Sequence, residues 1–154
     1  MQGLHLTADL LDCRCPPALL LDAAGLERFA VEACVRHGLC VVGTYFHQFR
    51  DGEGHPAGVT GTVVLAESHF ALHTWPEIAG VTLDVYVCNF SADNSQRARG
   101  LFAEAIATFA PNRLETREVL RGAGVWSERE TKEVPHGAPC PPPLPHIRDG
   151  GEAG

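Results

Sequence analysis

The stretch GTVVLAESHFALHTWPEIAGVTLDVYVC, residues 61–88, decides the fold. It contains three short runs rich in β-branched and apolar residues, which are typical of strands: 61–68, 69–75 and 81–88. The segment PEIAG, residues 76–80, supplies a turn between the second run and the third. Because the connections are so short, these strands are expected to pair as antiparallel neighbours.

Segments before and after this stretch are expected to add strands to the sheet and to form helices that cover it. Asp22 can cap a helix that runs to about His37, with apolar residues spaced for one buried face. A second helix is expected from Ser91 or Asp93 to Phe109. Further strands are expected at 39–49, at 113–122 and, as an edge strand, at 4–10. This order predicts an α+β fold, a two-layer α/β sandwich in which helices cover one face of a mostly antiparallel sheet.

Composition and charge indicate one small acidic domain. The chain has 154 residues, of which 45% are hydrophobic and 20% charged, with a formal net charge of −7. The negative charge argues against a broad electrostatic contact with nucleic acid or anionic lipid. No apolar run reaches the ~18 residues of a membrane span. No signal peptide is visible at the N-terminus, so we expect a cytoplasmic protein.

The last part of the chain differs in composition from the rest. Residues 126–154 hold six of the eleven prolines and almost no periodic apolar pattern. The chain is therefore divided into a domain, 1–125, and a Pro/Gly-rich tail, 126–154, which we expect to be disordered.

The six cysteines and eight histidines do not form a metal-binding pattern. No two cysteines have the CxxC spacing of structural zinc sites. His69 and His73 are spaced H-x(3)-H, but the segment between them is expected to be a strand. We therefore predict no metal site.

The polar residues Glu67-Ser68-His69 interrupt an otherwise apolar β sequence. Ser, His and Glu side chains together suggest a hydrolase. However, the G-x-S-x-G elbow is absent, and no strand–Ser–helix arrangement surrounds Ser68. A triad hydrolase is therefore disfavoured.

The expected turns indicate which polar residues are neighbours. A turn centred near Ile78 pairs residues whose numbers sum to about 156, which places Cys88 opposite Ser68. A reversal of the chain near Glu67-Ser68, so that 61–67 pairs with 69–75, places Thr60 near Thr74 and the neighbouring His73. His73 lies five residues from Ser68, roughly 16 Å along an extended strand. If both groups serve one reaction, a second subunit must supply one of them.

The segment GVTGTVVLAESHFALHTWPE (58–77), with DVYVC (84–88), resembles the bacterial S-adenosylmethionine decarboxylase proenzymes, the prokaryotic class of these pyruvoyl-dependent enzymes. The resemblance extends from about His5 to Gly122 and includes VVGTYFHQF and REVLRG. The motif is long and contains rare residue choices, so it is specific.

The resemblance implies that the chain cleaves itself at the Glu67–Ser68 bond. In that family the serine attacks the preceding carbonyl to form an ester, and elimination then splits the chain and leaves a pyruvoyl cofactor. The products here would be a β chain, 1–67, and an α chain, 68–154. His73 matches the proton acceptor of processing. Thr60 in GVTG matches the hydroxyl residue that the family has in GVSG.

The resemblance also implies the roles of residues in the decarboxylation. The pyruvoyl group would form a Schiff base with S-adenosylmethionine and accept the electrons left when CO2 departs. Cys88 matches the proton donor, a role that suits a thiol near neutral pH. Phe49 and Trp75 match residues that stack on adenine, and Glu77 matches the residue that binds the ribose hydroxyls.

The implied product is decarboxylated S-adenosylmethionine, an aminopropyl donor for spermidine biosynthesis. The implied assembly is a homodimer or higher oligomer whose sites are shared between protomers. Two alternatives stay open: a pyruvoyl-dependent decarboxylase of another amino acid such as ornithine or arginine, and a non-processed regulatory homologue. The presence of Ser68, His73 and Cys88 argues against the second alternative.

Overall fold

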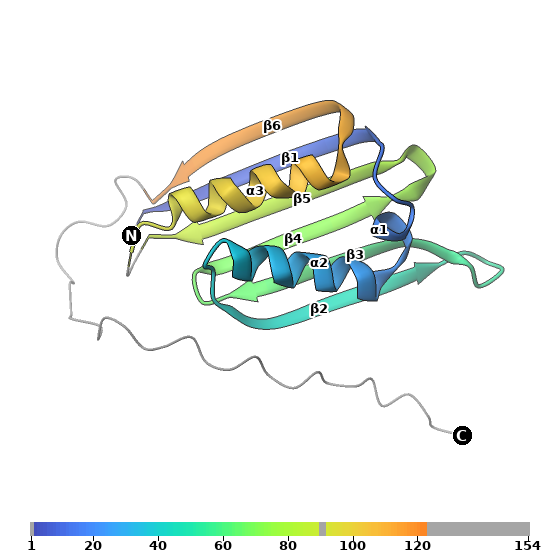
Figure 1. Ribbon diagram of the computed structural model, residues 1–154, viewed down its shortest axis with the longest axis horizontal. Helices are drawn as coiled ribbons and strands as arrows, with labels where there is room; N and C mark the ends of the chain where they lie inside the picture. The colour runs from blue at the N-terminus through green and yellow to red at the C-terminus, as the bar shows by residue number, and fades with distance from the viewer. Residues whose placement is uncertain (1, 90–91, 123–154) are drawn as a thin grey trace, which may run out of the picture.

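A six-stranded sheet with helices on one face makes up the computed structural model, which describes residues 2–89 and 92–122 (Figure 1). The strands are β1 (Gly3–Cys13), β2 (Val41–Arg50), β3 (Pro56–Leu65), β4 (Ser68–Trp75), β5 (Gly80–Cys88) and β6 (Pro111–Arg121). The helices are α1 (Ala18–Leu21), α2 (Ala23–Arg36) and α3 (Ser95–Phe109), and a 3-10 turn, η1, spans Pro76–Ile78. The predicted α+β sandwich is confirmed.

The strands follow the order β2-β3-β4-β5-β1-β6, and every neighbouring pair is antiparallel. The prediction that the N-terminal strand lies at an edge is wrong, because β1 lies between β5 and β6. The last described strand returns after α3 and pairs with the first along its whole length. Alternation in a sequence identifies the buried face of a strand, but not which strands lie beside it.

The core lies between the sheet and the two longer helices (Figure 1). In β5 every second residue, from Val81 to Val87, is buried against them. The helices approach the sheet closely because several of their buried residues are small. These are Ala30, Ala33 and Cys34 of α2 and Ala98 and Ala105 of α3.

The helix boundaries follow from local chemistry. The Asp22 carboxylate accepts a hydrogen bond from Ala24 N–H and begins α2, as predicted. Gly38 follows α2 with a φ of 71°, which glycine adopts without strain. The prediction did not include α1. The proposed start at Ser91 and the tail, 126–154, lie outside the described residues. Within those residues, no helix has the length and apolar character needed to cross a membrane.

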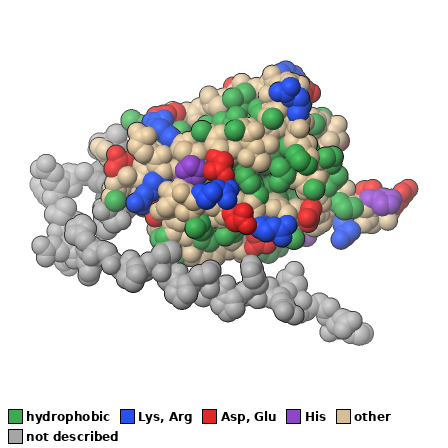
Figure 2. All heavy atoms as spheres, viewed as in Figure 1, with side chains coloured by type: hydrophobic (Ala, Val, Ile, Leu, Met, Phe, Trp, Pro, Cys, Tyr) green, Lys and Arg blue, Asp and Glu red, His purple; other side chains and the backbone are tan. Residues whose placement is uncertain are grey.

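An ion-pair cluster joins the two helices on their solvent side. Charged side chains of both signs gather over this face of the molecule (Figure 2). Arg36 Nη2 lies 2.5 Å from one Glu104 carboxylate oxygen, and His37 Nε2 lies 2.8 Å from the other. The hydrogen bond from Arg36, and then that from His37, hold the pKa of Glu104 below its ordinary value.

The substitution Glu104→Gln should lower the free energy of unfolding at neutral pH by about 0.5 kcal/mol, a value typical of partly exposed ion pairs. Because the folded-state pKa of Glu104 is depressed, its contribution is present above the unfolded-state pKa of about 4.3 and is lost as the pH falls through the folded-state value. Urea unfolding at pH 7 and in acid should therefore give a difference that shrinks in acid. Glu32→Gln, at a more exposed position, is the control, and an equal difference at both pH values would contradict the explanation.

Candidate active site

The face of the sheet away from the helices carries the polar and aromatic residues identified in the sequence. In β4, Phe70, Leu72 and Thr74 are buried on the helix side. The alternate residues, His69, His73 and Trp75, therefore lie on the other side. This open face displays the side chains that can react with or bind a ligand.

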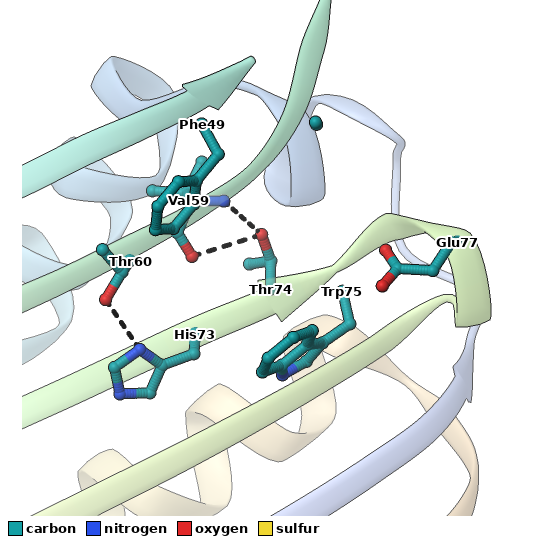
Figure 3. A pocket seen from close by; sticks show the side chains of 8 residues that line it. Phe49, Val59, Thr60, His73, Thr74, Trp75 and Glu77 are labelled. Carbon is teal, nitrogen blue, oxygen red and sulfur yellow. Dashed lines mark hydrogen bonds between the residues drawn. The ribbon is translucent and has the colours of Figure 1, made fainter. Parts of the chain in front are cut away.

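A pocket of about 330 Å³ lies at one end of this face, where β2, β3 and β4 meet the turn η1 (Figure 3). It brings together all five predicted residues of the pocket group, namely Phe49, Thr60, His73, Trp75 and Glu77. Ala57, Val59 and Thr74 complete the lining. Five residues spread over 29 positions of sequence thus contribute to a single cavity.

Thr60 and His73 are directly opposite each other in the β3–β4 ladder. Thr60 Oγ1 lies 2.7 Å from His73 Nδ1, within hydrogen-bonding distance (Figure 3). The prediction placed Thr60 near Thr74 and the neighbouring His73, and the structure selects His73 as its direct partner. A hydroxyl at this distance fixes the orientation of the imidazole and the position of its second nitrogen.

The aromatic residues of the pocket are unusually exposed. Phe49 is 48% exposed and Trp75 is 47% exposed, although both are large and apolar. Figure 3 shows the two rings on either side of the pocket, with the Glu77 carboxylate beyond Trp75. Exposed aromatic surface beside a carboxylate is suited to a ligand that has a flat ring and hydroxyl groups.

Buried hydrogen bonds fix the floor of the pocket. The Thr74 hydroxyl accepts a hydrogen bond from Val59 N–H (2.8 Å) and donates one to the Leu20 carbonyl (2.7 Å). Gly58 has a φ of 133°, and a β-carbon there would lie 2.9 Å from the Thr74 carbonyl oxygen. Only glycine fits this close approach of β3 to β4. The pocket is therefore tied to α1 and held in one shape.

The two residues of the predicted cleavage bond, Glu67 and Ser68, and the predicted proton donor Cys88 lie at the opposite end of β4 and are called the cleavage group below. Ser68 is the first residue of β4, five residues before His73. Its φ of 156° is a value that residues other than glycine rarely adopt. Within one protomer the cleavage group and the pocket group are thus separated by roughly 16 Å of extended strand, as predicted.

The predicted pairing of Cys88 with Ser68 is wrong by one residue. Ser68 pairs with Val87, and the backbone N–H of Cys88 instead donates to the Glu67 carbonyl at 2.9 Å. The cause is the turn: Gly80 belongs to β5 and pairs with Trp75, so the paired residue numbers sum to 155. Cys88 is nevertheless in direct contact with the residue that precedes Ser68.

The Glu67 side chain anchors the turn between β3 and β4. Its carboxylate accepts a hydrogen bond from Cys40 N–H (3.2 Å), and Ala66 N–H donates to the Cys40 carbonyl (2.8 Å). These two bonds attach the turn to the segment that follows α2. The peptide between Glu67 and Ser68 is therefore held from both sides, by residue 40 and by Cys88.

The sequence analysis assigned no role to two residues near Ser68, namely Asp84 and His5. Ser68 Oγ lies 3.1 Å from His69 Nδ1, and His69 Nε2 lies 3.1 Å from Asp84 Oδ1. The other Asp84 oxygen lies 2.7 Å from His5 Nε2. His5 and Asp84 come from β1 and β5, so only the observed strand order brings them together. Their polar character at alternate positions of apolar strands was the available signal. Within the described residues, no three His, Cys, Asp or Glu side chains are grouped to hold a metal ion.

Comparison with known proteins assigns this arrangement to a family. Residues 4–122 match the model of the family described as S-adenosylmethionine decarboxylase. A relative from Pelotomaculum thermopropionicum, named S-adenosylmethionine decarboxylase proenzyme, is 34% identical over 132 residues, which are 86% of this chain and 94% of the relative. A relative of the same name from Thermodesulfovibrio yellowstonii is 31% identical and covers 87% of this chain and 89% of its own length.

A solved structure is similar as well. The crystal structure of the adenosylmethionine decarboxylase from Aquifex aeolicus matches with a TM-score of 0.68 and 28% sequence identity. The match covers 85% of this chain and 97% of that chain. The likeness therefore extends over most of this chain and nearly all of that one.

Proposed function

The chain belongs to the S-adenosylmethionine decarboxylase family, and we propose that it removes CO2 from S-adenosylmethionine after cleaving itself between Glu67 and Ser68. One observation carries the proposal: the match to the family covers both the scissile turn and the pocket, and both keep the groups that the chemistry needs. The product is decarboxylated S-adenosylmethionine, whose aminopropyl group serves spermidine biosynthesis.

Self-processing is supported by the conformation of the turn. The Ser68 hydroxyl forms an ester with the Glu67 carbonyl carbon as the peptide C–N bond breaks. Removal of the proton from the α-carbon of Ser68 then breaks the Cβ–Oγ bond and releases the carboxylate of chain 1–67. The residue left at position 68 loses ammonia by hydrolysis and becomes a pyruvoyl group. The φ of 156° at Ser68 and the Cys88 N–H bond to the Glu67 carbonyl favour attack at this peptide.

His73, held by Thr60, is the proposed acceptor of the α-carbon proton during elimination. It lies too far from Ser68 of its own protomer to take that proton. The proposed arrangement is therefore a homodimer or higher oligomer, in which the pocket group of one protomer faces the cleavage group of its partner.

The pyruvoyl group, once formed from Ser68, supplies a carbonyl that can condense with the substrate amine and accept electrons as CO2 leaves. The chain's own residues bind the substrate and move protons. Phe49 and Trp75 stack on the adenine, and Glu77 accepts hydrogen bonds from the ribose hydroxyls. The Cys88 thiol donates the proton that replaces the carboxylate.

The substrate is tested by measuring CO2 release from S-adenosylmethionine, ornithine and arginine with the processed protein. Release from S-adenosylmethionine alone is expected, because the pocket offers two aromatic rings and a carboxylate to an adenosyl group. Release from ornithine or arginine, with none from S-adenosylmethionine, would contradict the proposal.

Shared sites predict that two inactive variants restore each other's activity. Cys88→Ala damages the cleavage group, whereas Glu77→Gln damages the pocket group. In a mixed dimer, the intact cleavage group of the second variant meets the intact pocket of the first. Co-expressed protomers that associate at random should regain about a quarter of wild-type activity, since half of the dimers are mixed and each holds one intact site.

The control for this experiment is a mixture of the two variants purified separately and assayed before their subunits exchange. It should show only the residual activity of the single variants. An equally low activity of the co-expressed protein, with mixed dimers demonstrated by affinity tags, would place each complete site within one protomer.

A further inference from the structure

A chain of four polar side chains crosses the open face beside the scissile turn. It begins at Ser68 Oγ, continues through the His69 ring to the Asp84 carboxylate, and ends at His5. The three successive distances are 3.1, 3.1 and 2.7 Å. These residues come from β4, β5 and β1, which are adjacent in the sheet. The function proposed above uses only the first of them.

The Asp84 carboxylate, at the centre of this chain, determines which ring nitrogen of His69 carries the proton. A carboxylate accepts hydrogen bonds and does not donate them, so Asp84 requires a proton on His69 Nε2 and on His5 Nε2. Neutral His69 then has an unprotonated Nδ1, and this atom lies beside the Ser68 hydroxyl. In this tautomer the Ser68 hydroxyl can donate its hydrogen bond to Nδ1, a nitrogen able to take its proton.

The carbonyl that this hydroxyl must attack is held by a donor. Cys88 N–H donates to the Glu67 carbonyl oxygen at 2.9 Å. This bond polarises the carbonyl and is in place to stabilise the negative charge that develops on its oxygen during attack. Nucleophile, base and oxyanion donor are therefore all contributed by the same protomer.

We propose that His69 is the catalytic base of the acyl shift at Ser68 and that Asp84 and His5 are its positioning residues. This inference rests on the proposed self-processing and adds the groups that perform its first step. The proton of Ser68 Oγ moves to His69 Nδ1 as the Oγ–C bond to Glu67 forms. The same proton then moves from His69 to the Ser68 nitrogen as the C–N bond breaks, so the ester forms with no net change in charge.

The surroundings of His69 and His5 favour their proposed roles as base and positioning residue. The Tyr86 ring contacts both His5 and His69, with centroids 5.6 and 5.9 Å away, and limits the rotation of each ring. The Arg121 guanidinium lies over the same tyrosine, 4.4 Å from its centroid. His73 cannot replace His69 within one protomer, because it lies five residues further along β4.

The test follows freshly synthesised precursor by intact mass, with and without hydroxylamine, which attacks esters and would release chain 1–67. Removal of a general base slows a reaction by about 10²- to 10⁴-fold. The His69→Asn precursor should therefore release little fragment under either condition. Wild-type precursor should be cleaved without hydroxylamine, whereas His73→Ala precursor should release fragment only with it, since its ester forms but elimination fails.

Two further measurements separate a chemical role from a structural one. Added imidazole should restore cleavage to a His69→Ala precursor, because it can occupy the vacated space and accept the proton. Asp84→Asn should slow cleavage by about 10²-fold, the loss that misplacement of a catalytic group can cause, and Asp84→Glu, which keeps the carboxylate, should recover part of the rate. The matched controls are His55→Asn and Asp51→Asn, since these residues form a His–Asp pair in an exposed turn at the end of β3 far from Ser68 of the same protomer.

Each outcome decides between the two proposals. If the wild-type precursor is cleaved and a folded His69→Asn precursor is cleaved at the same rate, the role of His69 is overturned and self-processing stands. The same conclusion follows if the His69→Asn precursor releases fragment with hydroxylamine at the wild-type rate. A His69→Ala precursor that imidazole does not restore would overturn it too. A wild-type precursor that yields no fragment under either condition would overturn self-processing and the role of His69 together.

Discussion

The Ser68→Ala protein should remain a single chain of 16.6 kDa and release no CO2 from S-adenosylmethionine. Alanine has no hydroxyl to attack the Glu67 carbonyl, so neither the ester nor the pyruvoyl group can form. The loss should be complete within the limits of the assay, because amino-acid side chains have no ketone carbonyl that can accept electrons from the substrate. Intact mass and radiometric CO2 release measure both effects on one sample.

The control for Ser68→Ala is Thr62→Ala, which removes a hydroxyl from the neighbouring strand β3. The Thr62 hydroxyl donates a long hydrogen bond, 3.4 Å, to the Phe70 carbonyl, so its loss should leave cleavage and activity unchanged. Cleavage of the Ser68→Ala chain after residue 67 would show that a different nucleophile, or a contaminating protease, cuts this bond.

The Cys88→Ala protein should be cleaved normally but release CO2 about 10²- to 10⁴-fold more slowly, the effect expected when a proton donor is removed. Processing survives because the contact between this residue and the Glu67 carbonyl is made by its backbone N–H, which alanine also has. The proposed decarboxylation step uses the thiol itself. This variant therefore separates the two reactions, with mass reporting the first and CO2 release the second.

Cys15→Ala is the matched control for Cys88→Ala, since Cys15 is also a free, partly exposed thiol but lies after the other end of β1. Its CO2 release should equal that of the wild type. A Cys88→Ala protein that keeps wild-type activity would assign the proton donor elsewhere, and one that stays uncleaved would give the thiol a part in processing.

The local elements of the fold could be predicted from the sequence because their signals are local. The cap at Asp22, the glycine at position 38 and the alternation in 81–88 each depend on residues close in the chain. The place of β1 could not be predicted, because it depends on pairing with β6, whose residues follow their partners by 98 to 118 positions. The register of β4 on β5 was wrong by one because Gly80 extends the strand and shortens the turn.

In the candidate site, too, local contacts could be predicted from the sequence and long-range contacts could not. Thr60 and His73 lie on strands joined by one tight turn, so their proximity could be predicted to within one residue from residue numbers. The contacts of Asp84 with His69 and His5 need the order of three strands, two of them distant in sequence. The sequence reasoning set aside a Ser–His–acid arrangement because the hydrolase elbow was absent, yet the sheet assembles one across its open face.

The intact mass of the purified wild-type protein tests the central claim, cleavage at Glu67–Ser68, most directly. Two fragments are expected: one that ends at residue 67, and one that begins at residue 68 and is lighter by one ammonia than a chain starting with serine. A blocked N-terminus on the second fragment would agree with a pyruvoyl group. A single chain of 16.6 kDa from a folded, freshly purified protein would contradict the account.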